Sequence, residues 1–169
     1  MSQDLATVTH AMVTSRLDYC NSLYAGLPLG LIRKLQLVQN AVARVLTGIS
    51  YQSHITPVLR QLHWLPVEFR IRFKVLVLTF KALSGFGPAY LRDRLSLYVP
   101  WRSLRSANKY LLVVPGPKEA RLASTRARAF SVLAPAWWNA LSMETRAQRD
   151  ILSFHRACKT ELFRQAFGD

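Results

Sequence analysis

Residues that could hold a metal are few in this chain and lie far apart. A structural zinc site usually brings together two close pairs of ligands. Here only His155 and Cys158, three residues apart, can share one side of a predicted helix. The candidate ligands are His10, His54, His63, His155, Cys20 and Cys158. We therefore expect no metal site, and the two distant cysteines favour a reducing compartment.

Motifs of nucleophilic and phosphate-transfer enzymes do not occur in the sequence either. No serine stands in a Gly-x-Ser-x-Gly turn. The Gly85-Phe86-Gly87 stretch lacks the lysine of a phosphate-binding loop. A triad built from scattered serine, histidine and aspartate side chains stays open, although no pattern indicates one. We expect a protein that is not an enzyme, with no cofactor and no small-molecule substrate.

Basic residues dominate the charge of the chain. The 169 residues include 23 Lys and Arg against 9 Asp and Glu, which gives a formal net charge of +14. A pI near 10.7 favours nucleic acid, an acidic partner or an anionic membrane surface as the partner. A basic piece of a longer protein, with its acidic parts elsewhere, is the alternative.

Two groups of basic residues are candidates for contacts with phosphates. Arg70, Lys74 and Lys81 are spaced i, i+4 and i+11, so they share one face of a predicted helix. Residues 99–128 contain seven basic residues and Glu119 as their single acid. The residues predicted to contact nucleic-acid phosphates are Arg70, Lys74, Lys81, Arg102, Arg105, Lys109, Arg121, Arg126 and Arg128. The alternative is that the helix stripe is an ordinary solvated face.

Aromatic residues near the basic segment can serve a nucleic acid or the core. Trp101 and Tyr110 are interleaved with its basic residues and could stack on unpaired bases. Trp137 and Trp138 sit in an apolar helical run, which favours core packing. Core packing is also the alternative for Trp101 and Tyr110.

The stretch over residues 54–85 must organise the fold. Pro57 and Pro66 mark two helix starts and Gly85 suits a left-handed C-terminal cap. Between Pro66 and Gly85 apolar residues occupy almost every helical direction, which indicates a buried helix. Lys74 and Lys81 interrupt the run, so it is too short for a membrane span.

Further helices are predicted on both sides of this stretch. Apolar spacing predicts a helix over 4–25 and another from Pro28 to Gly48, followed after the central stretch by a short helix between Pro88 and Tyr98. Residues 130–141 predict a helix interrupted at Pro135. Asp150 is a plausible N-cap of a last helix. Tyr110 to Val114 has the composition of a short strand, with a hairpin as an option.

The pattern predicts a mainly α fold. We expect a compact helical bundle with a basic loop or a short β-hairpin segment and C-terminal helices. Composition divides the chain into a helical unit at 1–98, a basic connector at 99–128 and a helical segment at 129–169 that packs on the first unit.

Long phrases of the sequence resemble one known family. They resemble the region that follows the polymerase core in non-LTR, LINE-type retrotransposons of the jockey-like group, in the same order along nearly the whole chain. The phrases are SRLDYCNSLYAGLP (15–28), LQLVQNAVARVLTG (35–48), HITPVLRQLHWLPVEFRIRFKVLVLTFKAL (54–83), RSLRSANKYLLVVP (102–115), RARAFSVLAPAWWNAL (126–141) and FHRACKTELFRQAF (154–167).

The resemblance implies the thumb-like part and C-terminal tail of a reverse transcriptase. That region is expected to hold template RNA or an RNA–DNA hybrid by its backbone. The polymerase itself needs adjacent aspartates in a Tyr-x-Asp-Asp turn to bind two metal ions, and no Asp-Asp occurs here. The resemblance therefore carries over no catalytic residue. An interaction fragment or an inert fragment without retained activity is the alternative function.

Partners and location follow from these expectations. The expected partner is RNA or an RNA–DNA hybrid, bound by its backbone. Exposed apolar faces would also permit self-association. The first ten residues have neither a basic nor an apolar leader region, so we expect an intracellular protein, cytoplasmic or nuclear, that is not secreted and has no transmembrane segment.

Overall fold

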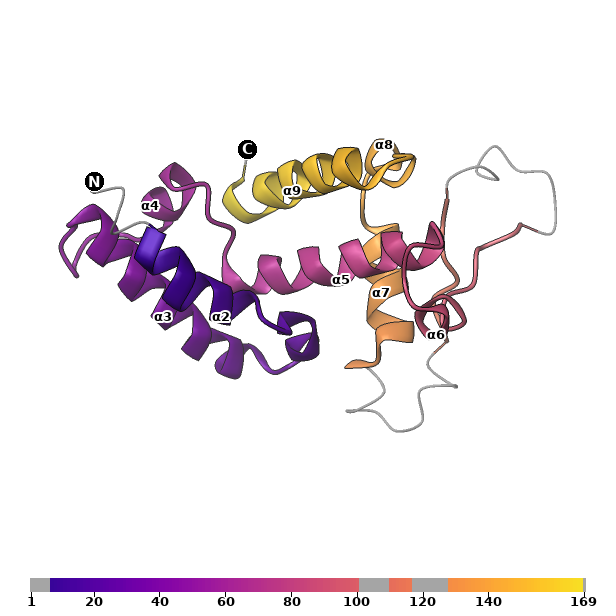
Figure 1. The fold of residues 1–169 in the computed structure, drawn as a ribbon, viewed down its shortest axis with the longest axis horizontal. Helices are drawn as coiled ribbons and strands as arrows, with labels where there is room; N and C mark the ends of the chain where they lie inside the picture. The colour runs from indigo at the N-terminus through magenta and orange to yellow at the C-terminus, as the bar shows by residue number, and fades with distance from the viewer. Residues whose placement is uncertain (1–6, 101–109, 117–127, 169) are drawn as a thin grey trace. The chain divides into compact units, whose positions relative to one another are not determined.

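A computed structural model gives the fold and describes residues 7–100, 110–116 and 128–168. These residues are mainly helical, which confirms the predicted fold class (Figure 1). The elements are a π-helical segment η1 (His10–Thr14), α2 (Ser15–Asp18), a 3-10 turn η2 (Asn21–Tyr24), α3 (Leu29–Thr47), α4 (Thr56–Gln61), α5 (Val67–Leu83), α6 (Ala89–Arg92), α7 (Phe130–Asn139), α8 (Met143–Arg146) and α9 (Ile151–Phe167).

The chain groups into two compact units. The first unit comprises Met1–Ile71 and Leu162–Asp169, and the second comprises Arg72–Glu161. Both boundaries fall inside continuous helices, α5 and α9, so each of these helices contributes to both units. The division at 1–98, 99–128 and 129–169 remains a prediction from composition.

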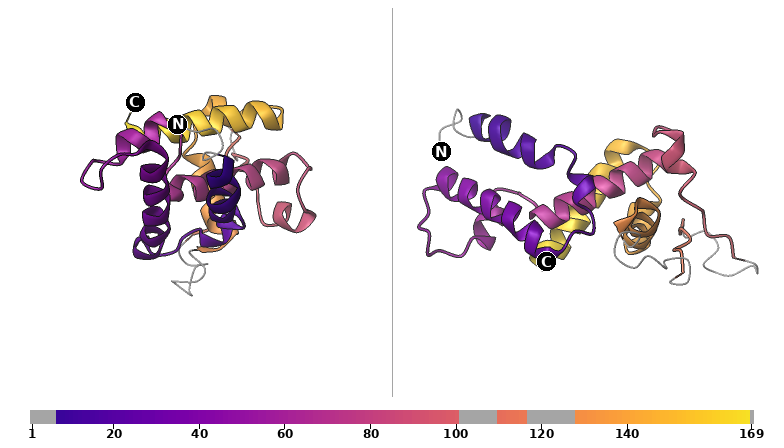
Figure 2. Two further views of the ribbon diagram at one scale, coloured as in Figure 1. Left: turned by 60° about the vertical axis from the view of Figure 1, so that its left-hand side comes forward. Right: turned by 90° about the horizontal axis from the view of Figure 1, so that it is seen from below.

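The N-terminal segment is not the single regular helix predicted over residues 4–25. Its described part passes from η1 to α2, stops at Tyr19, and resumes as the 3-10 turn η2 (Figures 1 and 2). Cys20 between them has φ of 51°, a left-handed conformation that ends a helix. Met12, Tyr19 and Leu23 belong to the apolar spacing that predicted this helix, and all three are exposed. Apolar spacing therefore did not predict burial for these three side chains, because the first unit leaves them exposed.

The helix α3 holds the start of α5 in the first unit. Pro66 has no amide hydrogen, and the next amide, that of Val67, donates to Oε1 of Gln36 at 2.8 Å. The buried Gln39 donates from Nε2 to the Leu65 carbonyl at 2.9 Å. A core cluster of Ala43, Val58 and Leu59 lies nearby, and Ile49, Ile55, Leu62, Trp64 and Phe167 pack against it.

The helix α5 is buried on nearly every side, as its composition predicted. Its exposed side chains are Glu68, Lys74 and Lys81. Gly85 caps it with φ of 78°, in the predicted left-handed conformation, and the Gly87 amide donates to the Lys81 carbonyl at 2.9 Å. Across the described ranges no helix combines the length and the hydropathy needed to cross a membrane.

Three helices meet around Phe154 in the second unit. The Phe154 ring of α9 stacks on Phe80 of α5 at 4.4 Å between centroids and on Trp138 of α7 at 5.6 Å. Burial of Trp138 confirms the prediction that it packs in the core. The predicted interruption at Pro135 is wrong, because α7 runs through this buried proline. Asp150 caps α9 as predicted and accepts from the amides of Leu152 and Ser153.

The segment from Tyr110 to Val114 forms less β-structure than a hairpin. Its β pairing within the described ranges is one antiparallel bridge between Leu97 and Leu112. Asn139 of α7 holds the same backbone, because its Oδ1 accepts from the Leu112 amide at 2.9 Å and its Nδ2 donates to the Leu112 carbonyl at 2.8 Å. The backbone of this segment is therefore paired with residues 96–98 on one edge and with the Asn139 side-chain amide on the other.

Candidate nucleic-acid interface

Lys74 and Lys81 form the exposed basic face of α5 within the second unit. They are two helical turns apart, about 10 Å along the axis. The side chains around them on α5 are buried or half-buried, so the two ammonium groups stand out from an apolar surface. Neither lysine side chain forms an ion pair or a hydrogen bond with another described residue. Both charges are therefore presented to solvent.

His155 of α9 lies beside these two lysines. Its ring packs edge-on against Phe73 of α5 at 5.0 Å between centroids. Burial lowers the pKa of His155 below 6.5, and the charges of Lys81 and Lys74 lower it further. No carboxylate is among the described groups that shift this pKa. The surroundings of His155 are therefore electropositive and lack a compensating acid from the described part of the chain.

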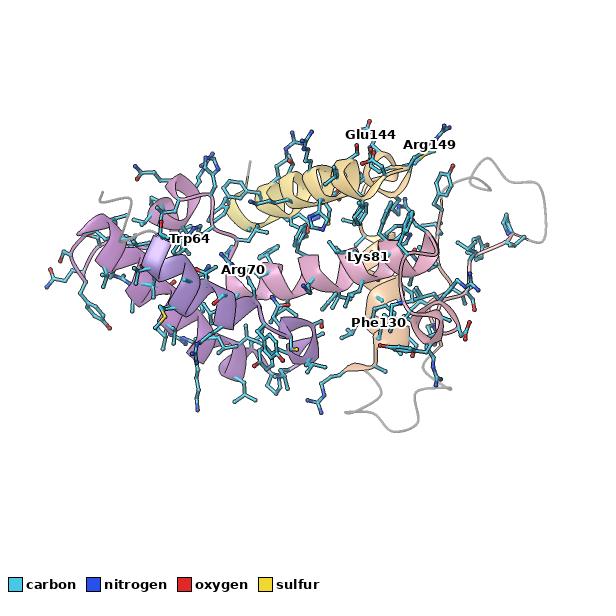
Figure 3. The ribbon with its side chains drawn as sticks, in the orientation of Figure 1. Trp64, Arg70, Lys81, Phe130, Glu144 and Arg149 are labelled. Carbon is cyan, nitrogen blue, oxygen red and sulfur yellow. The ribbon has the colours of Figure 1, made fainter. Side chains whose placement is uncertain are left out.

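Arg70, the third member of the predicted stripe, has a different environment in the first unit. Its Nη1 lies 2.9 and 2.8 Å from the two carboxylate oxygens of Asp18, and its Nε donates to the Leu65 carbonyl at 3.0 Å. Only 15% of its side chain is exposed. Arg70 therefore ties α2 to the start of α5, and it is a weaker candidate for a phosphate contact than the lysines (Figure 3).

Most of the basic segment lies outside the described residues. This holds for Arg102, Arg105, Lys109, Arg121 and Arg126. Arg128 is described and exposed, just before α7 begins. Tyr110 is 55% exposed, while its backbone carbonyl accepts from Nε1 of the buried Trp138 at 2.7 Å. The Tyr110 backbone is thus held in place and its ring remains accessible.

Two further basic residues of α9 were not among the sequence-predicted contacts. Lys159 follows His155 by one helical turn, so both lie on the same side of α9. Arg156 is exposed next to His155. The sequence shows that Lys159 lies four residues after His155 and that Arg156 is its neighbour. It does not show that His155 lies close to Lys74 and Lys81 of α5.

The possible metal ligands do not cluster where the structure describes them. No group of three or more His, Cys, Asp or Glu side chains comes together in that part of the chain. Cys158 is fully buried, and burial raises the pKa of its thiol to about 12, with the nearby Glu161 adding to the shift. A thiol with a raised pKa stays protonated at neutral pH and reacts slowly as a nucleophile.

No family model, curated protein or solved structure matches this chain.

Proposed function

We propose that this chain is a non-enzymatic protein that binds RNA or an RNA–DNA hybrid by the backbone, without sequence preference. The main support is the pair of exposed lysines on the largely buried helix α5, Lys74 and Lys81, which lie beside His155 of α9. The net charge of +14 adds a long-range attraction for polyanions. The resemblance to the post-polymerase region of non-LTR reverse transcriptases agrees with this activity.

The binding mode follows from the chemistry of the side chains. An ammonium group contacts a phosphate oxygen and releases condensed counterions, which favours binding at low salt. Such contacts position a nucleic acid but do not read its sequence. The exposed ring of Tyr110 can add stacking on an unpaired base, worth about 1–3 kcal/mol. Single-stranded RNA and hybrids are therefore the appropriate first ligands.

Fluorescence anisotropy with labelled single-stranded RNA and with an RNA–DNA hybrid tests the proposal. We expect binding at about 50 mM salt that weakens steeply by about 200 mM. Oligonucleotides of unrelated sequence should bind with similar affinity. Undetectable binding at low salt, or an affinity that is independent of salt, would contradict the proposal.

Matched charge variants test the site on α5. The Lys74→Gln/Lys81→Gln variant should reduce the slope of log affinity against log salt by about 1.4 for single strands, because about 0.7 is lost per phosphate contact. The control is Arg16→Gln/Arg164→Gln, which removes the same charge from exposed positions of the first unit. Equal effects of the two variants would show that net charge alone drives binding.

A second variant tests the basic segment. Reversing the charge at Arg102, Arg105, Arg126 and Arg128 should weaken binding to all sequences alike. Loss restricted to one sequence would argue against backbone recognition.

A protein-interaction role is the second candidate function. It is favoured by exposed apolar side chains along α3, among them Leu31, Val38 and Val45. Size-exclusion chromatography after nuclease treatment and at varied salt separates the two functions. Association that survives both treatments favours protein contacts over nucleic acid.

A further inference from the structure

The helix α3 is apolar on two sides, and only one of them is covered. Ile32, Ala43 and Leu46 are buried on the covered side. On the other side Leu31, Val38 and Val45 are 47%, 46% and 67% exposed. These three side chains recur every seven residues and form one stripe along the helix, and the exposed Leu29 and Leu37 lie away from it.

The open side has the spacing of a coiled-coil seam. Leu31, Leu35, Val38, Val42 and Val45 follow one another at intervals of four, three, four and three residues. This places Leu31, Val38 and Val45 at d positions and the half-buried Leu35 and Val42 at a positions of a heptad. The helix is 19 residues long, about 28 Å, which gives a partner helix two heptads to pack against.

The charges on α3 decide which partner fits. Its charged residues are Arg33, Lys34 and Arg44, with no acid in the whole helix. Lys34 is exposed and occupies a g position, where it would face the flank of a partner helix. A second copy of this chain would bring another purely basic helix to the seam. Charge complementarity therefore favours a partner with acidic flanks.

We propose that the stripe of Leu31, Val38 and Val45 docks an amphipathic helix of another protein that carries acidic residues beside its apolar seam. This partner site is independent of the nucleic-acid site on α5. The helix is held from behind by its buried face and by Gln36 and Gln39, so the stripe is presented on a fixed element.

Designed peptides test this proposal on the full chain. The probe is a labelled peptide of about three heptads with leucine at a and d and glutamate at e and g. One comparison peptide has lysine at e and g, and another has the acidic composition with a scrambled order. We expect the glutamate peptide to bind at least tenfold more tightly than either comparison peptide. Equal binding of the acidic and scrambled peptides would overturn the proposal, because attraction to the net charge would suffice.

Protein variants locate the site. Leu31→Ser/Val38→Ser/Val45→Ser should weaken binding of the glutamate peptide by more than tenfold while the circular dichroism spectrum stays unchanged. The matched control Val99→Ser/Met143→Ser/Leu152→Ser, at exposed apolar positions of the second unit, should leave binding unchanged. Lys34→Glu should shift the preference toward the lysine peptide. An unaltered preference overturns the proposal, and so does dimerisation of the chain that the triple variant abolishes.

Discussion

The pKa of His155 is sensitive to the charges of the two exposed lysines beside it, Lys74 and Lys81. This histidine can therefore be used to measure the electrostatics of the candidate interface. The pKa of His155 lies below 6.5 because of burial first and the charges of Lys81 and Lys74 second. In an NMR titration, Lys74→Gln/Lys81→Gln should move this pKa upward. A phosphate backbone bound at the lysines should move it upward as well. No change on RNA binding would place the RNA elsewhere.

The lowered pKa of His155 also predicts that the stability of the fold depends on pH. Because the folded pKa of His155 is depressed, the fold favours the neutral ring over the charged one. Its contribution is complete above 6.5 and is lost as the pH falls through the folded pKa. Urea unfolding of the wild type and of His155→Gln should therefore differ in slope against pH in the acidic range. Parallel profiles would contradict this prediction.

The two cysteines should react very differently. Cys20 is exposed, whereas Cys158 is fully buried with a thiol pKa raised to about 12. Because the thiolate is the reactive form, a maleimide should label the native chain once and the denatured chain twice. Mass spectrometry counts the labels. The Cys20→Ser variant should acquire no label before unfolding, and native double labelling would refute the assigned burial.

At the scale of elements, substitutions of a glycine in the connection after α5 and of a glycine in the first turn of α3 should have opposite effects on stability. A Cβ at Gly87 would lie 2.9 Å from the backbone nitrogen of Ala82, so Gly87→Ala should destabilise the fold by about 1–3 kcal/mol. Gly30 in α3 has open space around it, so Gly30→Ala should stabilise the fold by up to about 1 kcal/mol. Chemical denaturation measures both. The same sign for both variants would contradict the local geometry.

Prediction of helix boundaries from the sequence was correct where the signal was local. Gly85 after a periodic run and Asp150 before one are both caps in the structure. It failed at Pro135, because burial in the second unit holds α7 together through a residue that usually disrupts helices. It also failed at Cys20, since no side-chain pattern announced the left-handed break there.

For the whole molecule, the continuity of α5 and α9 through both units predicts one cooperative unfolding transition. Leu76 of α5 is fully buried, so Leu76→Ala should cost about 2–5 kcal/mol. In hydrogen exchange, this change should lower the free energy of opening equally for α3 in the first unit and for α7 in the second. A loss limited to α7 would mean that the units unfold separately.

The sequence alone determined the helical class, the burial of α5 and the start of α9 at Asp150. These features depend on hydrophobic periodicity and on capping residues, and both signals lie in the sequence of the helix itself. The tertiary structure decided which charges and apolar faces were already occupied. Asp18 forms an ion pair with Arg70, which lies 52 residues further along the chain. The exposed apolar stripe of α3 and the side chains of Lys74 and Lys81 remain accessible. A single side chain does not encode its distant partner, so only the folded chain separates a structural arginine from lysines that remain available to bind.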